Sequence, residues 1–321
     1  MPHAAFSLPA DDGLALQCQA WQTEQPPSAV IIVVHGMAEH TGRYAELGLA
    51  LNEAGIALYG YDQRGHGLTA QPGTLGLFAL EHGWRKAVGD VQTVARHVAA
   101  QHPHTPLFLL GHSMGSYIAQ AHLMQGGFAW TGAVLSGSNF QPATLYKVAS
   151  LVAKFETWRQ GPQGRSALID WLSFGSFNKA FEPNRTAFDW LSRDPAAVDR
   201  YIADPLCGFR CTNRFWQDLL RGLQQISNRA NLARIAPALP ILIIGGECDP
   251  VSAGKRLKDL RDALAHTGTH IELLLYTGAR HELFNETNRA QVTSDLLAWL
   301  QRRMSQPGPR DTVISPAKEL I

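Results

Sequence analysis

The most restrictive feature of this 321-residue chain is a regular alternation of apolar runs with segments of helical periodicity. Four segments are apolar almost without interruption, which is typical of strands buried on both faces: 29–34, 56–61, 107–110 and 132–136. Apolar residues recur at helical spacing between these segments, over 44–54, 84–100 and 116–124. The alternation predicts an α/β fold with a mostly parallel central sheet and helices on both faces.

A second feature is a break in this alternation. Residues 140–235 carry helical patterns and many aromatic side chains but no convincing buried strand, and the alternation resumes at residue 239. We therefore expect a core formed by residues 1–139 and 236–304, with residues 140–235 inserted as a helical cap. Residues 305–321 contain prolines and little apolar content, and we expect them to form a mobile tail.

Ser113 lies in the most informative motif, Gly111-His112-Ser113-Met114-Gly115, between a predicted strand and a predicted helix. Glycines two residues to either side allow the strand and the helix to pack closely around a serine in an unfavourable backbone conformation. That geometry exposes the hydroxyl at the end of the sheet and places a helix N-terminus beside it. We expect Ser113 to be a nucleophile; the alternative is a glycine-rich turn with a solvated serine.

A serine nucleophile needs a base, and the base needs a carboxylate that orients it. Catalytic groups gather at the carboxyl ends of parallel strands, and two late predicted strands are followed by loops that contain Asp249 and His281. The chain order Ser113, Asp249, His281 is the nucleophile, acid and base order of this sheet architecture. The competing candidates are less well placed in the predicted elements: His266 and His270 for the base, and Glu247 and Asp259 for the acid.

An oxyanion hole needs two backbone N–H donors. The N–H of Met114 directly follows the nucleophile, and that of Met37 belongs to the loop after an early strand. Gly36 in that loop would let the backbone approach a substrate oxygen; otherwise His35-Gly36 is an ordinary turn. In a neighbouring loop, we expect Asp62 and Arg64 to pair beneath the site in a structural role.

These motifs resemble those of the α/β-hydrolase family, and within it the monoacylglycerol lipase and lysophospholipase-like group. Five features carry the resemblance: the loop from His35 to His40 with Arg43-Tyr44, the segment from Asp62 to Gly67, the serine motif, Asp249 and His281. The resemblance covers about residues 10–304 and implies an α/β-hydrolase fold with a catalytic triad, an oxyanion hole and a lid. Two residues depart from the smaller ones common in the group, and both departures bear on the substrate: Met37 and Ser116.

We therefore expect a serine hydrolase that cleaves esters of monoacylglycerol or lysophospholipid type through an acyl-enzyme, without a metal or an organic cofactor. Ser113 would attack the carbonyl, His281 would pass the proton to the leaving alcohol, and Asp249 would orient the imidazole. Three alternatives remain open. They are a general short-chain carboxylesterase, a non-catalytic small-molecule-binding protein on this scaffold, and an aminopeptidase of the same fold with Glu156, Glu182 or Asp189 holding the substrate amine.

The composition excludes several kinds of partner and site. A formal net charge of +1 with scattered basic residues argues against nucleic acid as a partner. Four cysteines are too few for a disulfide scaffold. Cys207 and Cys211 have the spacing of half a metal site that no second pair completes, so we expect free thiols. Because the chain shows neither a signal-peptide pattern nor a long apolar stretch, we expect a cytoplasmic enzyme acting on a small lipid or ester.

Residues 141–160 place several apolar side chains at helical spacing: Leu145, Val148, Val152, Phe155 and Trp158. Such a face is typical of a lid helix that covers a site or makes transient contact with a membrane surface. The alternative is a cap helix that packs this face on its neighbours. Further aromatic residues between 171 and 216 could line an acyl pocket or simply form the core of the cap. The sequence gives no indication of the oligomeric state.

Overall fold

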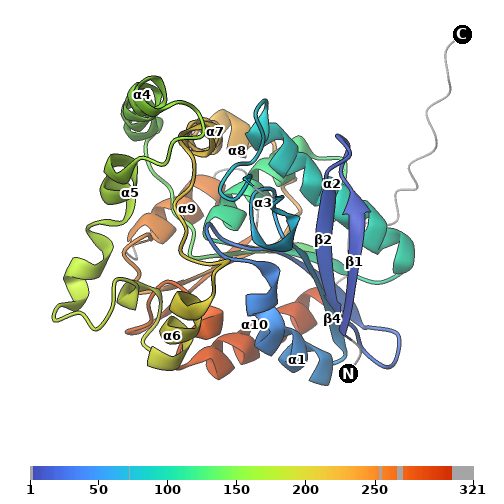
Figure 1. Cartoon of the computed structure of the whole chain (residues 1–321). Helices are drawn as coiled ribbons and strands as arrows, with labels where there is room; N and C mark the ends of the chain where they lie inside the picture. Colours follow the sequence, from blue (N-terminus) through green and yellow to red (C-terminus); the bar gives the residue numbers. More distant parts are fainter. Residues whose placement is uncertain (1–2, 72, 253–254, 266–269, 306–321) are drawn as a thin grey trace, which may run out of the picture.

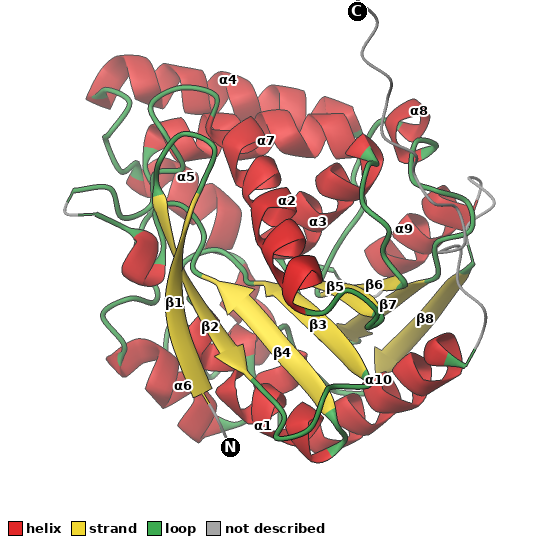
Figure 2. Cartoon of the chain, turned by 90° about the vertical axis from the view of Figure 1, so that its right-hand side faces the viewer, coloured by secondary structure: helices red, strands yellow, loops and turns green. Residues whose placement is uncertain are grey.

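The computed structural model describes residues 3–71, 73–252, 255–265 and 270–305. Its centre is a sheet with the strand order β1-β2-β4-β3-β5-β6-β7-β8 (Figures 1 and 2). The pairs β1–β2 and β2–β4 are antiparallel, and all the others are parallel, which confirms the predicted sheet. The strands are β1 (His3–Pro9), β2 (Ala15–Trp21), β3 (Ala29–Val34), β4 (Ile56–Tyr61), β5 (Leu107–His112), β6 (Gly132–Ser136), β7 (Ile241–Gly246) and β8 (Ile271–Tyr276).

Helices cover both faces of the sheet (Figure 2). On β3, Val30, Ile32 and Val34 join one apolar core, and Ile31 and Val33 join the other, because successive side chains of a strand point to opposite faces. The first core is closed by α2, α3 and α9, and the second by α1 and α10. The bounds of these helices are α1 (Ala45–Glu53), α2 (Gly83–Gln101), α3 (Met114–Gln125), α9 (Lys255–Ala265) and α10 (Arg289–Met304).

The segment between β6 and β7 is helical throughout its regular structure, and we call it the cap. Its longest helix, α4, packs along α7, and α7 in turn packs on α2 and α3 of the core. Figure 1 shows α4, α5 and α7 together at one end of the molecule. The cap helices are α4 (Ala143–Gln160), α5 (Ala167–Phe174), α6 (Pro195–Ala203), α7 (Asn213–Ile226) and α8 (Arg229–Leu232), with short 3₁₀ turns η3 (Phe177–Phe181) and η4 (Asp189–Leu191).

The observed elements differ from the sequence predictions at a few ends. β5 continues to His112 and α3 begins at Met114, so strand and helix are separated by Ser113 alone. β1 was not predicted, because its alternating pattern is weak: it is an edge strand with most side chains at least partly exposed. The predicted tail lies outside the described residues except for Ser305. None of the described helices combines the length and the apolarity needed to cross a membrane.

Candidate active site

Ser113 is the residue at which β5 turns into α3. Its backbone has φ 50° and ψ −121°, a conformation that costs a non-glycine residue about 1–3 kcal/mol. Two glycines make the turn possible: a Cβ on Gly111 would lie 2.6 Å from the carbonyl oxygen of Gly115, and a Cβ on Gly115 would lie 1.9 Å from that of Val34. The N–H of Ser113 donates to the carbonyl oxygen of Ser136 at the end of β6 (2.8 Å). The turn therefore has the tight geometry that the sequence predicts.

Asp249 follows β7 and His281 follows β8, and their side chains meet. His281 Nδ1 lies 3.0 Å from Asp249 Oδ2, and both residues are buried, with 3% and 1% of their surface exposed. Since a carboxylate only accepts, we assign the proton to Nδ1, which leaves a lone pair on Nε2. The Asp249 carboxylate also accepts from Ser252 Oγ (2.8 Å) and from the N–H of Val251 (2.9 Å).

The charges of this pair depend on each other. Burial opposes ionisation of Asp249, but His281 and the donors from Ser252 and Val251 outweigh it, so the pKa of Asp249 lies below its ordinary value. Burial likewise opposes protonation of His281, but Asp249 outweighs it and raises the pKa of His281 above its ordinary value. The imidazole is therefore a stronger base than one free in water.

The imidazole of His281 lies beside the turn that carries Ser113. Its ring centroid is 4.8 Å from that of His112, and its Cε1 lies 3.0 Å from the place that a Cβ on Gly137 would take, directly after β6. Among the described side chains, no hydrogen bond joins the Ser113 hydroxyl to His281. In enzymes without substrate such a bond is often long, and it tightens when substrate binds.

The loop from His35 to His40, which follows β3, lies against the serine turn. A Cβ on Gly36 would be 3.3 Å from Ser113 Cβ and 2.8 Å from Glu39 Oε1, so a side chain here would crowd both residues. Ala38 adopts a φ of 54°, a second strained position beside the turn. Within the described ranges, neither the N–H of Met37 nor that of Met114 donates to a backbone carbonyl. Both N–H groups thus stay available for a substrate oxygen.

Buried charged residues join this loop to the loop of His281. Arg43 donates to Glu39 Oε2 (2.8 Å) and to both carboxylate oxygens of Glu282 (2.5 and 2.6 Å). Glu39 also accepts from the N–H of Gly36 and from Tyr44 Oη. Although burial opposes the charge, Arg43 lowers the pKa of Glu39 to about 2, so the carboxylate stays ionised at neutral pH. The network fixes two loops whose relative position a shared site requires.

The cap also holds this loop. The carbonyl oxygen of Ala38 accepts from Tyr201 Oη on α6 (3.1 Å) and from the N–H of Gly208 (2.9 Å). The guanidinium of Arg43 lies 4.8 Å above the ring of Tyr201. The strained conformation of Ala38 is therefore stabilised by contacts that come from the cap.

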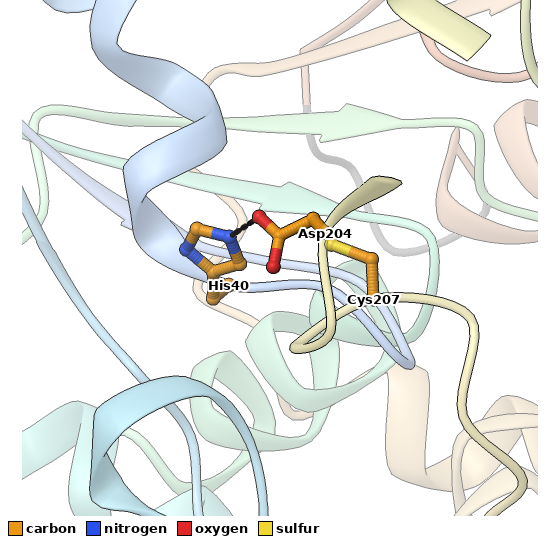
Figure 3. Close-up of side chains that lie close together, drawn as sticks. All are labelled: His40, Asp204 and Cys207. Atoms are coloured by element: carbon orange, nitrogen blue, oxygen red, sulfur yellow. Dashed lines mark hydrogen bonds and ion pairs between the residues drawn. The ribbon is translucent and has the colours of Figure 1, made fainter. Parts of the chain in front are cut away.

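A third contact with the cap could also suit a metal ion. Figure 3 shows His40, Asp204 and Cys207 facing one another, and one ligand atom of each lies within 4.8 Å of the others. His40 Nε2 is 2.8 Å from Asp204 Oδ2, while its Nδ1 accepts from the N–H of Gly42. His40 Nε2 then carries a proton, which a metal ion would have to displace. Burial also raises the pKa of the Cys207 thiol, which disfavours the thiolate that a metal ion would bind. We interpret this cluster as a tie between loop and cap, with Cys207 and Cys211 as free thiols.

Asp62 and Arg64 do not form the predicted pair. Asp62 instead accepts from the N–H groups of Thr41 (2.8 Å) and Leu68 (2.7 Å) and so joins two loops. The guanidinium of Arg64 makes paired hydrogen bonds to two other carboxylates, Asp12 and Asp90. The prediction of a pair was wrong because Asp12 and Asp90 satisfy the guanidinium while Asp62 is engaged by backbone N–H groups; both residues keep a structural role.

The other described candidates for base and acid are exposed, unlike His281 and Asp249. His270 precedes β8, at the opposite end of that strand from His281, and its side chain is 63% exposed. Glu247 is exposed, and Asp259 is an exposed residue of α9. His266 lies outside the described residues.

The apolar face predicted for residues 141–160 is exposed on α4 rather than packed on its neighbours. Trp158 is 81% exposed, and the other side chains of the face are more than half exposed, apart from the partly buried Val152. The helix buries Tyr146, Ala153 and Glu156 on its other side. We call the exposed side chains the α4 face: Leu145, Val148, Leu151, Phe155 and Trp158.

Three neighbours of the site have no motif that would have revealed them. Trp190 is, in the sequence, only one of many aromatic residues in the cap, yet its ring lies 5.2 Å from that of His281. Tyr201 reaches Ala38 across a separation of 163 residues. Glu282 directly follows His281 in the sequence, and this position is the one feature that could have pointed to it. Its partner Arg43 is 239 residues away.

Comparisons with known proteins agree with the fold. Residues 25–288 match the model of a family described as serine aminopeptidase, S33. The chain is 28% identical to the monoacylglycerol lipase of Mycolicibacterium smegmatis, over 90% of this chain and 93% of that protein, and 29% identical to the monoglyceride lipase of Homo sapiens, over 92% and 90%.

Solved structures extend this likeness to three dimensions. A thermostable carboxyl esterase from Bacillus coagulans superposes with a TM-score of 0.87 at 26% identity, over 95% of this chain and 99% of that chain. A soluble variant of the monoglyceride lipase of Saccharomyces cerevisiae shares the fold, with a TM-score of 0.74 at 22% identity over 94% and 96%. The chain therefore belongs to the family described as serine aminopeptidase, S33, and is an α/β-hydrolase similar to the monoacylglycerol lipases.

Proposed function

We propose that this protein is a serine hydrolase that cleaves carboxylic esters of monoacylglycerol or lysophospholipid type through an acyl-enzyme. The observation that carries the proposal is the pair of His281 and Asp249, hydrogen-bonded at 3.0 Å and buried beside the strained turn of Ser113. A nucleophile, a base and an orienting acid from three separate loops are the set that acyl transfer needs.

In the proposed reaction, His281 Nε2 takes the proton of the Ser113 hydroxyl as its oxygen attacks the ester carbonyl. Asp249 keeps Nδ1 protonated and stabilises the imidazolium that forms. The N–H groups of Met37 and Met114 donate to the developing oxyanion. The imidazolium then protonates the leaving alcohol, and water repeats the sequence on the acyl-serine, which releases the acid and restores the free serine.

The carboxylates of the cap argue against an aminopeptidase. Asp189 accepts from the N–H groups of Arg185 and Thr186. Glu156 is buried and accepts from three side chains, Arg159, Gln160 and Ser166. The carboxylate oxygens of Asp189 and Glu156 are thus already engaged by donors of the protein and not free to hold a substrate amine. Glu182 is an exposed residue. The relatives named as monoacylglycerol or monoglyceride lipases favour an ester of glycerol, and the carboxyl esterase from Bacillus coagulans keeps a short-chain ester as the second candidate.

The test is a hydrolysis profile of the whole chain and of Ser113→Ala. We expect kcat/KM for monoacylglycerols and p-nitrophenyl esters to exceed that for amino-acid anilides by orders of magnitude, and Ser113→Ala to lose turnover while keeping its melting temperature. A preference for the shortest acyl chains would favour the carboxylesterase. Faster anilide cleavage would favour the aminopeptidase, and absence of any turnover would favour a binding protein.

We further propose that the α4 face makes transient contact with the surface of a lipid layer that holds the substrate. The face presents five large apolar side chains to solvent on one helix, and such faces insert into the boundary between headgroups and acyl chains. We expect Phe155→Ser with Trp158→Ser to reduce sedimentation with phosphatidylcholine vesicles and to leave cleavage of a dissolved short ester unchanged. Leu80→Ser, at a site 62% exposed outside the cap, is the matched control. Equal sedimentation of all three proteins would refute this contact.

A further inference from the structure

One aromatic side chain of the cap lies directly on the proposed base. The indole of Trp190, in η4, has its centroid 5.2 Å from that of the His281 imidazole, with 38° between the two planes. Both side chains are almost fully buried, Trp190 being 8% and His281 3% exposed. The two rings are therefore in contact with little water between them.

Backbone hydrogen bonds hold this contact in place. The N–H of His281 donates to the carbonyl oxygen of Trp190 (3.4 Å), and the N–H of Glu282 donates to that of Leu191 (2.8 Å). The N–H of Trp190 itself donates to Asn178 Oδ1 (2.9 Å). η4 thus runs beside the His281 loop as a segment whose backbone is hydrogen-bonded to that loop, which places the indole next to the imidazole.

The rest of the indole is enclosed by aromatic residues of the cap. Phe177 meets it edge to face at 5.0 Å, and Phe174 stacks parallel to it at 6.1 Å. Aromatic pairs in these geometries gain stability beyond the area that they bury. The position of Trp190 is therefore determined by the cap, and the contact makes the cap part of the environment of the base.

The groups around His281 have different charges. Asp249 is the carboxylate at Nδ1, and Glu39 and Glu282 add negative charge from two loops, with Arg43 between them. His112 lies 4.8 Å away but stays neutral at pH 7, because burial lowers its pKa to about 3. The indole is a neutral aromatic surface with an electron-rich face, and such a face attracts a cation far more than a neutral ring.

We propose that Trp190 is a positioning residue for the reaction, which holds the imidazole of His281 and favours its protonated form over its neutral form. The proposal rests on the proposed function, in which His281 becomes an imidazolium in both transition states. An interaction that is stronger with the imidazolium than with the imidazole accelerates the step in which that charge forms. The cap would thereby contribute directly to catalysis and not only to enclosure of the substrate.

The test compares Trp190→Leu and Trp190→Phe with the wild-type protein in the pH dependence of kcat/KM for a dissolved p-nitrophenyl ester. We expect Trp190→Leu to lower the rate at the alkaline plateau roughly tenfold and to move the acid limb about half a unit to lower pH. Trp190→Phe keeps a smaller aromatic face and should lie between the two. Trp171→Leu, which changes a tryptophan that is 64% exposed on α5, should behave like the wild type.

A role in packing alone makes a different prediction. It would lower the rate of both variants without moving the acid limb, or would admit water and move the limb to higher pH; either result overturns the proposal. If Trp190→Leu does not fold, the shift in Trp190→Phe alone decides. Failure of the proposed function is distinguishable, because Ser113→Ala would then keep its activity.

Fluorescence gives a second reading that does not depend on turnover. A protonated imidazole quenches a neighbouring indole. The emission of Trp190 is the difference in fluorescence between the variant Ser113→Ala and the double variant Ser113→Ala/Trp190→Phe. This difference should therefore fall as pH is lowered. The midpoint of the fall should coincide with the midpoint of the acid limb in the wild-type rate profile. A difference that does not change with pH would contradict the contact.

Discussion

Gly115→Ala is the sharpest test of how the serine turn and the loop from His35 to His40 fit together. A Cβ at this position would lie 1.9 Å from the carbonyl oxygen of Val34 and 2.5 Å from that of His35, both of them backbone atoms. Because real contacts of a Cβ do not fall below 3.0 Å, the start of the loop and the N-terminus of α3 must move apart by about 1 Å. Met37, two residues further, carries one of the two proposed oxyanion donors.

A displacement of this size has a large expected effect on rate. Misplacement by about 1 Å costs up to ~100-fold, and loss of one oxyanion donor costs on the order of 100- to 1000-fold in kcat. We therefore expect Gly115→Ala to lower kcat for a p-nitrophenyl ester on the order of 100-fold or more and to change KM little, since the donor acts mainly on the transition state.

The assay measures kcat and KM beside the melting temperature. Gly89→Ala is the matched control: it also replaces a glycine within a helix, but its Cβ would meet nothing within 4 Å. This control should keep full activity and gain about 1 kcal/mol of stability from helix propensity. If Gly115→Ala folds and keeps kcat within a factor of ~3 of the wild type, the proposed role of the loop is wrong.

Three further predictions concern hydrogen bonds and buried histidines. Tyr201→Phe removes the bond to the carbonyl oxygen of Ala38, and we expect about 1 kcal/mol less stability and a several-fold loss of kcat, measured by urea unfolding and ester hydrolysis. Asp249→Asn should lower kcat on the order of 10⁴-fold, because the imidazole loses the partner that fixes its tautomer. His66→Phe should reduce the sensitivity of folding to acid. Burial lowers the pKa of His66 to about 3, so the unfolded chain takes up a proton at a higher pH than the folded chain does. The free energy of unfolding is therefore unaffected above the unfolded pKa near 6.5 and falls as pH drops below it. At pH 5 the loss is about 2 kcal/mol.

Each of these predictions has an outcome that contradicts it. Tyr201→Phe with unchanged kcat would mean that the cap does not position the loop. An active Asp249→Asn would remove the acid from the proposed set. For His66→Phe, the measurement is the difference in unfolding free energy between pH 7 and pH 5. A difference equal to that of the wild type would show that His66 is not kept neutral by burial.

The architecture could be predicted from the sequence because its signals are local. Strands buried on both faces appear as continuous apolar runs, and β3 and β4 have the predicted bounds. The turn at Ser113 was predictable for the same reason, since close packing of strand and helix requires glycine at both flanking positions. The loops of Asp249 and His281 followed from the rule that parallel strands end at one edge of the sheet.

What could not be predicted depends on contacts between distant segments. Arg64 was expected to pair with the acid nearest in sequence, Asp62, whereas the fold brings Asp12 and Asp90 to it. The exposed side of α4 could not be told from a packed one, because an apolar stripe has the same spacing in either case. Trp190 reaches His281 only through the fold of the cap, for which no motif exists.

The central claim is that the hydroxyl of Ser113 attacks the ester while His281 removes its proton. The most direct measurement is peptide mass mapping after brief reaction with p-nitrophenyl acetate and acid quench, for the wild type and for His281→Ala. The account predicts an acetyl group on Ser113 of the wild type and almost none in His281→Ala at the same time point. An acetyl group on a different residue, or equal labelling of Ser113 in both proteins, would contradict it.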